Sequence, residues 1–243
     1  MRVAVISDIH GNLHALNAVL GALDDDSPDA VWCLGDLVGY GPRPNPCCTK
    51  VAGCAAVCLA GNHDLGVLGT LPLDEFSSEA ATAARWTQGV LGDDARTYLA
   101  GLSPEAAMPD AGAELYHASP RDPIWEYVLD AGSMRAALEE TSGPIILVGH
   151  SHVPIVAAIE NNHLSAGHAP DGTEIDLDEK VLLNPGSVGQ PRDGDPRAAY
   201  LVLDLGESLA TFRRVEYAIE RTQEEILERG LPEPLAERLA HGI

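Results

Sequence analysis

Two histidines separated by one serine follow an apolar run near the middle of the chain. His150 and His152 come directly after the segment PIILVG and precede a second apolar run, PIVAAIE. Imidazole is the commonest side-chain ligand of metal ions, and residues two apart on an extended backbone point to the same side. The pair could therefore bind a metal, or it could cap a turn. Further ligands elsewhere in the chain would favour the metal.

Aspartate, histidine and asparagine residues also stand where other predicted strands end. After four more apolar runs the chain carries Asp8 and His10, then Asp36, then Asn62, His63 and Asp64, and finally His117. One Asp or Asn at such a place is an ordinary turn residue. In α/β sheets, however, ligands bind outside the carboxyl ends of the strands. Five strand ends that carry this set are better explained by one metal site than by five separate caps.

The segments that position these residues alternate between strand and helix patterns. Residues 2–7 form an apolar run typical of a strand buried on both faces. Leucines at helical spacing follow in residues 12–23, and the alternation continues to residue 64. It predicts an α/β layered fold with crossover helices. Later apolar runs in 180–217 predict consecutive strands of a second sheet with mixed or antiparallel order, because the breaks between them are too short for helices.

The composition limits the classes of function. Acidic residues outnumber basic ones 37 to 15, which gives a formal net charge of −22. Such a surface repels nucleic acid and anionic membranes, although a local cationic site remains compatible with it. No apolar segment approaches the roughly 18 residues of a membrane span, and MRVAVISDIH turns polar too early for a signal peptide. We expect a cytoplasmic protein with one domain over residues 1–243 and peripheral helices at about 216–243.

The motifs DIH, GDLVGYG, GNHD, YHAS and GHSH resemble, in order and spacing, the signature of the calcineurin-like metallophosphoesterase superfamily. The later segment LNPGSVGQPRDG is similar to one in the small bacterial and archaeal phosphodiesterase branch of that superfamily. Together the motifs cover roughly the first 205 residues. The resemblance implies a four-layer α-β-β-α sandwich with two mixed sheets and a pair of metals at its upper edge.

The resemblance also implies a role for each motif residue. One metal would be bound by Asp8, His10 and His152, the other by Asn62, His117 and His150, and Asp36 would bridge them. Imidazole and carboxylate ligands suit two divalent transition-metal ions, with Mn2+ first and iron, zinc or nickel as alternatives. A metal-bridging hydroxide would attack phosphorus. His63 would protonate the leaving group, and Asp64 would either orient His63 or cap the adjacent turn.

Residues that would contact the substrate are less strongly indicated. Asn12 stands at a helix start, where it is either a substrate contact or an N-cap. Protein serine/threonine phosphatases carry Asp and Arg where the second motif has Gly39 and Tyr40, and the nearby Arg43 could partly substitute for them. Arg121 follows His117, and it could hold a phosphate or only wall the cleft. Arg192 ends the NPGSVGQPR segment, which is either a phosphate-binding loop or a turn between strands.

These observations favour a metal-dependent phosphodiesterase that hydrolyses small phosphate esters. A phosphomonoesterase or a dinucleoside-polyphosphate hydrolase on the same site is the first alternative. A scaffold that keeps the fold without turnover is a further alternative, but such relatives typically lose the ligand histidines. The expected partner is a small phosphoester, without bulk nucleic-acid binding or a membrane, and a homo-oligomer remains open.

Overall fold

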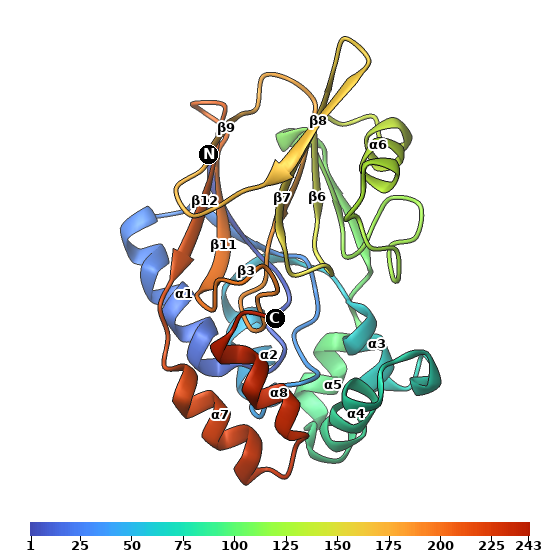
Figure 1. Ribbon diagram of the computed structural model, residues 1–243, viewed down its shortest axis with the longest axis vertical. Coiled ribbons are helices and arrows are strands. Elements are labelled where there is room, and N and C mark those ends of the chain that lie inside the picture. Colours follow the sequence, from blue (N-terminus) through green and yellow to red (C-terminus); the bar gives the residue numbers. More distant parts are fainter.

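Two six-stranded sheets form the centre of the molecule in a computed structural model that describes residues 1–243 (Figure 1). The first sheet contains β1 (Arg2–Ile6), β2 (Ala30–Cys33), β3 (Ala55–Cys58), β9 (Glu174–Asp176), β11 (Ala198–Asp204) and β12 (Leu209–Val215). The second contains β4 (Glu105–Met108), β5 (Ala113–Tyr116), β6 (Ile145–Val148), β7 (Pro154–Glu160), β8 (His163–His168) and β10 (Val181–Pro185). Their orders are β3-β2-β1-β11-β12-β9 and β4-β5-β6-β10-β7-β8, and both are mixed.

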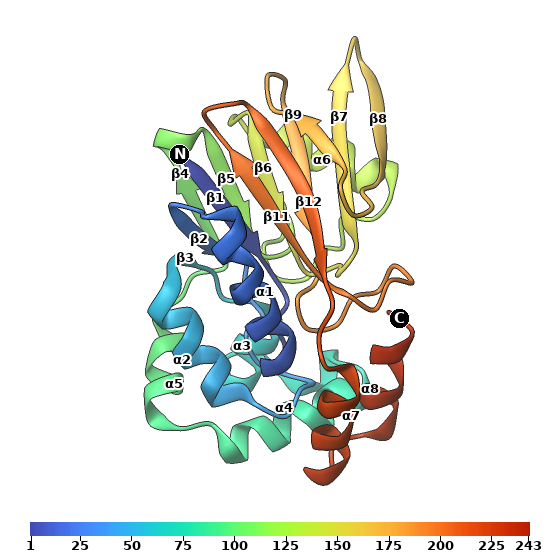
Figure 2. The same cartoon turned by 90° about the vertical axis from the view of Figure 1, so that its left-hand side faces the viewer.

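Helices cover the outer faces of both sheets. The chain forms α1 (Leu13–Asp26), α2 (Pro44–Cys54), α3 (Asn62–Leu68), α4 (Ser78–Val90), α5 (Asp93–Ala100), α6 (Ala131–Glu140), α7 (Ile219–Glu228) and α8 (Glu233–Glu237). Helices α1 and α2 pack on the first sheet, and α6 packs on the second (Figure 2). The predicted four-layer α-β-β-α sandwich is therefore confirmed. None of the helices is both long enough and apolar enough to cross a membrane.

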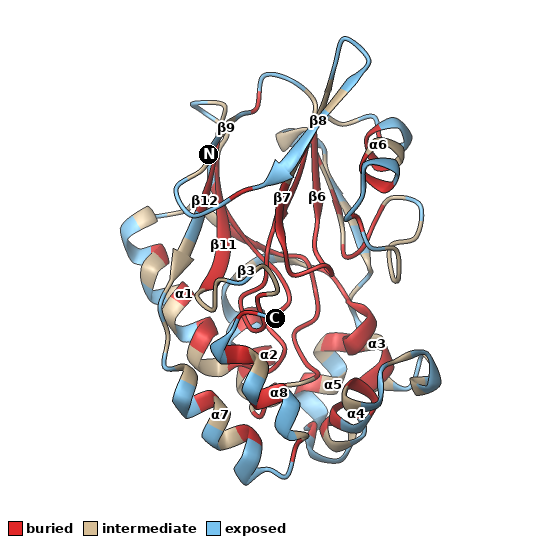
Figure 3. Ribbon diagram, in the orientation of Figure 1, coloured by how far each residue is buried: buried red, intermediate tan, exposed pale blue.

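Strand β1 shows why the central strands are apolar along their whole length. Side chains alternate between the two faces of a strand. Val3 and Val5 belong to the core between the sheets, whereas Ala4 and Ile6 belong to the core beneath α1. Figure 3 shows the same burial along β6 and β11. Polar residues can then enter these strands only at their ends, which is where the candidate ligands stand.

The prediction that the last apolar runs share one second sheet was wrong. Strand β10 lies in the second sheet between β6 and β7, but β11 and β12 join the first sheet beside β1. In β11, Tyr200 and Val202 face the helices, while Leu201 and Leu203 face the other sheet. A strand that is apolar on both faces must be covered on both faces. Beside β1 it is, because helices pack on one face of the first sheet and the second sheet packs on the other.

The two C-terminal helices lie across the ends of α1 and α4 (Figure 2). Ile226, Leu235 and Leu239 form a buried cluster with Ala83 of α4. On α7, Glu225 accepts hydrogen bonds from the guanidinium of Arg43 at 2.8 and 2.6 Å, and its carboxylate lies 3.2 Å from the ring of His14. The helices thus close the molecule at the end of the sheets where the polar motifs lie.

The Arg43–Glu225 ion pair should make this closure sensitive to acid. Hydrogen bonds from Arg43 lower the pKa of Glu225 below its ordinary value of 4.5. Its contribution to stability is therefore present above pH 4.5 and is lost as the pH falls through the lowered value. We expect Glu225→Gln to cost at most about 1 kcal/mol at pH 7, since the pair is partly exposed. Urea unfolding at several pH values should show this difference shrinking below pH 4.5; a difference unchanged at pH 3 would contradict the assignment.

Candidate metal centre

The motif residues of five strand ends lie together in one buried cluster. Strands β1, β2 and β3 run parallel in the first sheet, and β5 and β6 run parallel in the second. Their carboxyl ends meet at the same edge of the sandwich. Each of the following side chains is at most 4% exposed: Asp8, His10, Asp36, Asn62, His63, His117, His150 and His152. Residues far apart in the sequence thus share one enclosed site.

Asp8, His10 and His152 form the first group of candidate ligands. The Nε2 atoms of the two histidines are 3.0 Å apart, and Asp8 Oδ1 lies 3.4 Å from His152 Nε2 and 4.0 Å from His10 Nε2. One cation placed between these three atoms could contact all of them. The group is the one that the sequence motifs assigned to the first metal.

Asp36 connects this group to a second one that contains His117 and His150. Asp36 Oδ2 lies 3.6 Å from His10 Nε2 and 3.5 Å from His117 Nε2. Asn62 Oδ1 approaches His117 Nε2 to 3.3 Å. The carboxylate therefore stands between the two groups, in a position suited to a bridging ligand.

Backbone carbonyls orient the imidazole rings. The Nδ1 atoms of His10, His117 and His152 donate to the carbonyl oxygens of Val38, Leu34 and Gln190 at 3.1, 2.8 and 2.6 Å. A ring whose proton sits on Nδ1 presents the lone pair of Nε2, and such second partners are the rule for metal-bound histidine. All three rings thus turn Nε2 toward the centre of the cluster.

The donor set fits divalent cations. His10 and His152 face each other with two unprotonated nitrogens, and Asp8 Oδ1, Asp36 Oδ2 and His150 Nε2 are buried without a hydrogen-bond partner. Burial raises the pKa of Asp8 to about 7 and that of Asp36 well above its ordinary range. Burial also lowers the pKa values of His10, His150 and His152. Acceptors buried in this way are costly, and a cation between them would satisfy them together.

The backbone at these residues differs from the extended form that the spacing of His150 and His152 suggested. Both have positive φ, 62° and 60°, as do Asp8, His10 and Asp36. That expectation was wrong: the rings converge because left-handed turns aim them inward. A non-glycine residue in this region costs about 1–3 kcal/mol and persists only when its surroundings hold it there.

The NPGSVGQ segment, which begins in the last two residues of β10, supplies much of that support. Asn184 donates to the Gly149 carbonyl at 2.7 Å, Ser187 donates to the Asp8 carbonyl at 2.7 Å, and the Gly189 amide donates to the same carbonyl at 2.9 Å. The segment was expected to be either a phosphate loop or a turn. It braces the loops of both histidine motifs, a role that no spacing in the sequence indicates.

His63 lies beside the cluster without a polar partner for its ring. Its main-chain amide donates to Asp36 Oδ1 at 2.9 Å, while its Nδ1 is buried and free. Tyr40 packs against the ring at 4.4 Å between centroids. A Cβ at Gly39 would lie 2.5 Å from His63 Nδ1, so this packing excludes any larger residue there. Asp64 was expected either to orient His63 or to cap the adjacent turn. Its carboxylate accepts hydrogen bonds from the main-chain amides of Gly61 and Val38, as a cap does.

The four candidate substrate contacts lie in different surroundings. Asn12 caps α1 through the Ala15 amide and donates to the Gly189 carbonyl. Arg43 pairs with Glu225, and Arg121 is exposed and pairs with Glu126. Arg192 donates to the hydroxyl of Tyr40 at 3.4 Å and to the side chain of Gln190 at 2.8 Å. Of the three arginines, Arg192 alone has no carboxylate partner and borders the cluster.

Aromatic side chains that sequence reasoning did not assign to the site cover the cluster. Tyr127 stacks on the ring of His150 with a centroid distance of 4.1 Å, and Tyr40 contacts His10 at 4.6 Å. Phe76 contacts His63, and Trp125 contacts Phe76 in turn. These residues belong to loops without a periodic pattern, so the sequence alone does not indicate that they cover the cluster.

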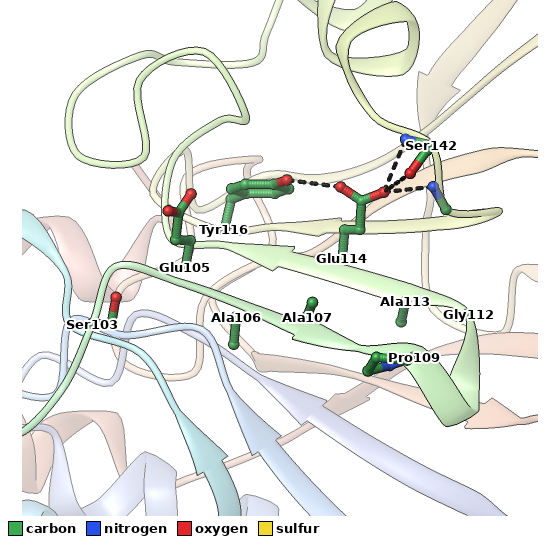
Figure 4. A pocket seen from close by; sticks show the side chains of 11 residues that line it. Ser103, Glu105, Ala106, Ala107, Pro109, Gly112, Ala113, Glu114, Tyr116 and Ser142 are labelled. Carbon is green, nitrogen blue, oxygen red and sulfur yellow. Dashed lines mark hydrogen bonds between the residues drawn. The ribbon is translucent and has the colours of Figure 1, made fainter.

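A cavity of about 720 Å3 lies elsewhere, along β4 and β5 (Figure 4). There Tyr116 donates to Glu114, which also accepts from the Ser142 amide at 2.9 Å. No histidine or cysteine lines it. The buried cluster, rather than this cavity, is the candidate site, because the potential metal-ligand atoms without a hydrogen-bond partner lie there.

Residues 1–208 match the family model of the calcineurin-like phosphoesterase superfamily domain, and the chain belongs to this family. An uncharacterized protein of Methanocaldococcus jannaschii is 40% identical over 246 residues, which cover 99% of this chain and 98% of that protein. The crystal structure of a metallophosphoesterase from Sphaerobacter thermophilus is 40% identical, with a TM-score of 0.90 and coverage of 100% and 99%. The protein is therefore a hydrolase that acts on phosphoester bonds, and its family is metal-dependent.

Two further comparisons are more limited. A hypothetical protein of Pyrococcus horikoshii, 22% identical, has the same fold with a TM-score of 0.79 over 100% of this chain and 98% of that chain. A symmetrical bis(5'-nucleosyl)-tetraphosphatase of Photorhabdus laumondii is 40% identical over 72 residues, which cover 28% of this chain and 26% of that protein.

Gly189→Ala should disrupt the cluster from a distance. A Cβ at Gly189 would lie 1.9 Å from the Ile9 carbonyl oxygen, so the NPGSVGQ segment must move away from the Asp8 loop. We expect a loss of roughly 1–3 kcal/mol in unfolding free energy and weaker Mn2+ binding, measured by thermal unfolding and calorimetric titration. Gly167→Ala is the control, since no atom lies within 4 Å of its Cβ position. Equal behaviour of the two variants would argue against the brace.

Proposed function

We propose that the protein is a dinuclear-metal phosphodiesterase of small phosphate esters. The position of Asp36 Oδ2, at 3.6 and 3.5 Å from one histidine of each ligand group, carries this proposal. A single metal would leave one group of buried acceptors unsatisfied. The first metal would be held by Asp8, His10 and His152. The second would be held by Asn62, His117 and His150, with Asp36 shared.

Two divalent cations, when bound, would activate water for attack on phosphorus and offset charge on the phosphoryl oxygens. The chain itself would supply orientation and a proton. His63 stands at the edge of the ligand cluster, and burial lowers its pKa, so its ring is neutral before substrate binds. An anionic phosphate beside the ring would raise its affinity for a proton. The ring could then pass that proton to the leaving oxygen.

Arg192 is the cation best placed to bind a phosphate of the substrate at the rim of the cluster. Its guanidinium lies 5.8 Å above the ring of Tyr40, which itself packs against His10 and His63. Arginine binds phosphate oxygens through paired donors. Arg43 and Arg121 are engaged with carboxylates, and either would have to leave its partner to reach a substrate.

A substrate comparison tests the proposed activity. With Mn2+ supplied, we expect the protein to hydrolyse bis-p-nitrophenyl phosphate with a higher kcat/KM than p-nitrophenyl phosphate. The reverse order would favour a phosphomonoesterase. Preference for diadenosine tetraphosphate over both would favour the dinucleoside-polyphosphate hydrolase, which the partial match to a bis(5'-nucleosyl)-tetraphosphatase supports. Metal-loaded protein without activity on any of these esters would contradict the proposal and favour a scaffold.

Two substitutions should separate the proposed roles of the site residues. His63→Ala should keep both metals while kcat falls about 100- to 10,000-fold, the range for loss of a general acid. Asp36→Asn should lose metal as well as turnover, because the shared carboxylate is removed. Elemental analysis after gel filtration and steady-state kinetics measure both effects. Exposed His163→Ala is the matched control. Metal loss in His63→Ala, or two metals retained in Asp36→Asn, would overturn the respective role.

A further inference from the structure

Two arginines from different parts of the chain meet at one neutral oxygen beside the metal centre. Arg192 donates to Gln190 Oε1 at 2.8 Å, and Arg238 donates to the same oxygen at 3.4 Å. Guanidinium groups are always charged and repel each other at such a place. The amide oxygen accepts both hydrogen bonds but offsets neither charge.

Neither of these two arginines has a carboxylate in direct contact, although acidic residues are abundant. Neither forms an ion pair within 4.0 Å, whereas Arg2, Arg43 and Arg197 each pair with a carboxylate. The other unpaired arginines have simple explanations. Arg96 donates to two helix carbonyls, and Arg85, Arg221 and Arg229 are exposed to solvent. Arg192 and Arg238 are partly buried, and Arg238 Nε is a buried donor without a partner.

The pair borders the candidate metal centre. Gln190 is 2% exposed, and its main-chain carbonyl oxygen accepts the hydrogen bond from His152 Nδ1 at 2.6 Å. Arg192 lies over Tyr40, which contacts the ring of His10. Arg238 directly follows α8, which Figure 1 shows beside the loop after β10. This end of the chain lies beyond residues 1–208, so the family match assigns nothing to it.

We propose that Arg192 and Arg238 form an anion subsite for a second phosphate of the substrate. A phosphate bound between them would receive charge-assisted hydrogen bonds from both guanidinium groups and would neutralise the pair. The site would then favour esters that carry two or more linked phosphates over esters with one. This inference rests on the proposed function, because it places the reacting phosphate at the metal centre.

Arg238 could instead only fasten the C-terminal segment to Gln190. The two roles differ in what they change. A fastening role would affect all ligands alike, through the position of His152. A subsite would affect only ligands that have a second phosphate. ADP and AMP provide this comparison, since they share a nucleoside and differ by one phosphate.

The experiment measures the binding of ADP and AMP to the Mn2+-loaded protein by calorimetry, with metal in excess over nucleotide. We expect the wild type to bind ADP more tightly than AMP. Arg238→Gln should weaken ADP binding about tenfold and leave AMP nearly unchanged, as expected for the loss of one charged hydrogen bond. Arg238→Lys should retain part of the preference. Arg229→Gln, which removes an exposed charge from the same segment, should retain all of it.

Equal affinities for ADP and AMP in the wild type would overturn the subsite. An equal loss of affinity for ADP and AMP in Arg238→Gln would also overturn it. The same holds if Arg229→Gln loses as much of the preference for ADP as Arg238→Gln does. The quantity compared is affinity and not turnover, so these outcomes are read separately from the hydrolysis assays. A protein that hydrolyses no ester but prefers ADP through Arg238 would contradict the proposed function and keep the subsite.

Discussion

The burial of two carboxylates among imidazole rings is the constraint on which the rest of the site depends. Asp8 and Asp36 are fully buried, and their pKa values are raised because water cannot solvate the charged form. The rings of His10, His117 and His152 already donate their Nδ1 protons to backbone carbonyls, so they turn acceptors inward. Such a set is unfavourable by itself and favourable around divalent cations. The geometry therefore suits metal ions, in a family that is metal-dependent.

The scaffold maintains this arrangement through loops rather than through the strands themselves. Five of the candidate ligands have left-handed backbone conformations, which side chains rarely adopt unaided. The loop amides and carbonyls hold one another, as in the bond from the His10 amide to the Asp36 carbonyl. The NPGSVGQ segment then ties the first motif, at Asp8, to the GHSH motif, at Gly149. Ligands from both sheets are thus coupled, and a disturbance of one loop reaches the others.

Charge is distributed unevenly between the surface and the site. The chain carries a net charge of −22, and most of its partly buried arginines are neutralised by carboxylates. Arg192 and Arg238 are left without such partners at the rim of the metal centre. The acidic surface repels anions elsewhere on the molecule, so anions would bind preferentially at these two arginines. In the proposed subsite, the segment after α8, which contributes Arg238, would bind substrate as well as help to enclose the site.

The sequence by itself determined the family, the α/β sandwich and the set of residues that cluster at the strand ends. This was possible because ligand types and spacings are local, and because buried strands are apolar on both faces. Tertiary structure decided what depends on contacts between distant segments. It placed β11 beside β1, turned His150 and His152 inward through positive φ, and paired Arg43 with Glu225. It also brought Tyr127 onto His150 and Arg238 onto Gln190. No pattern in the sequence records these contacts, since each joins residues that only the folded chain brings together.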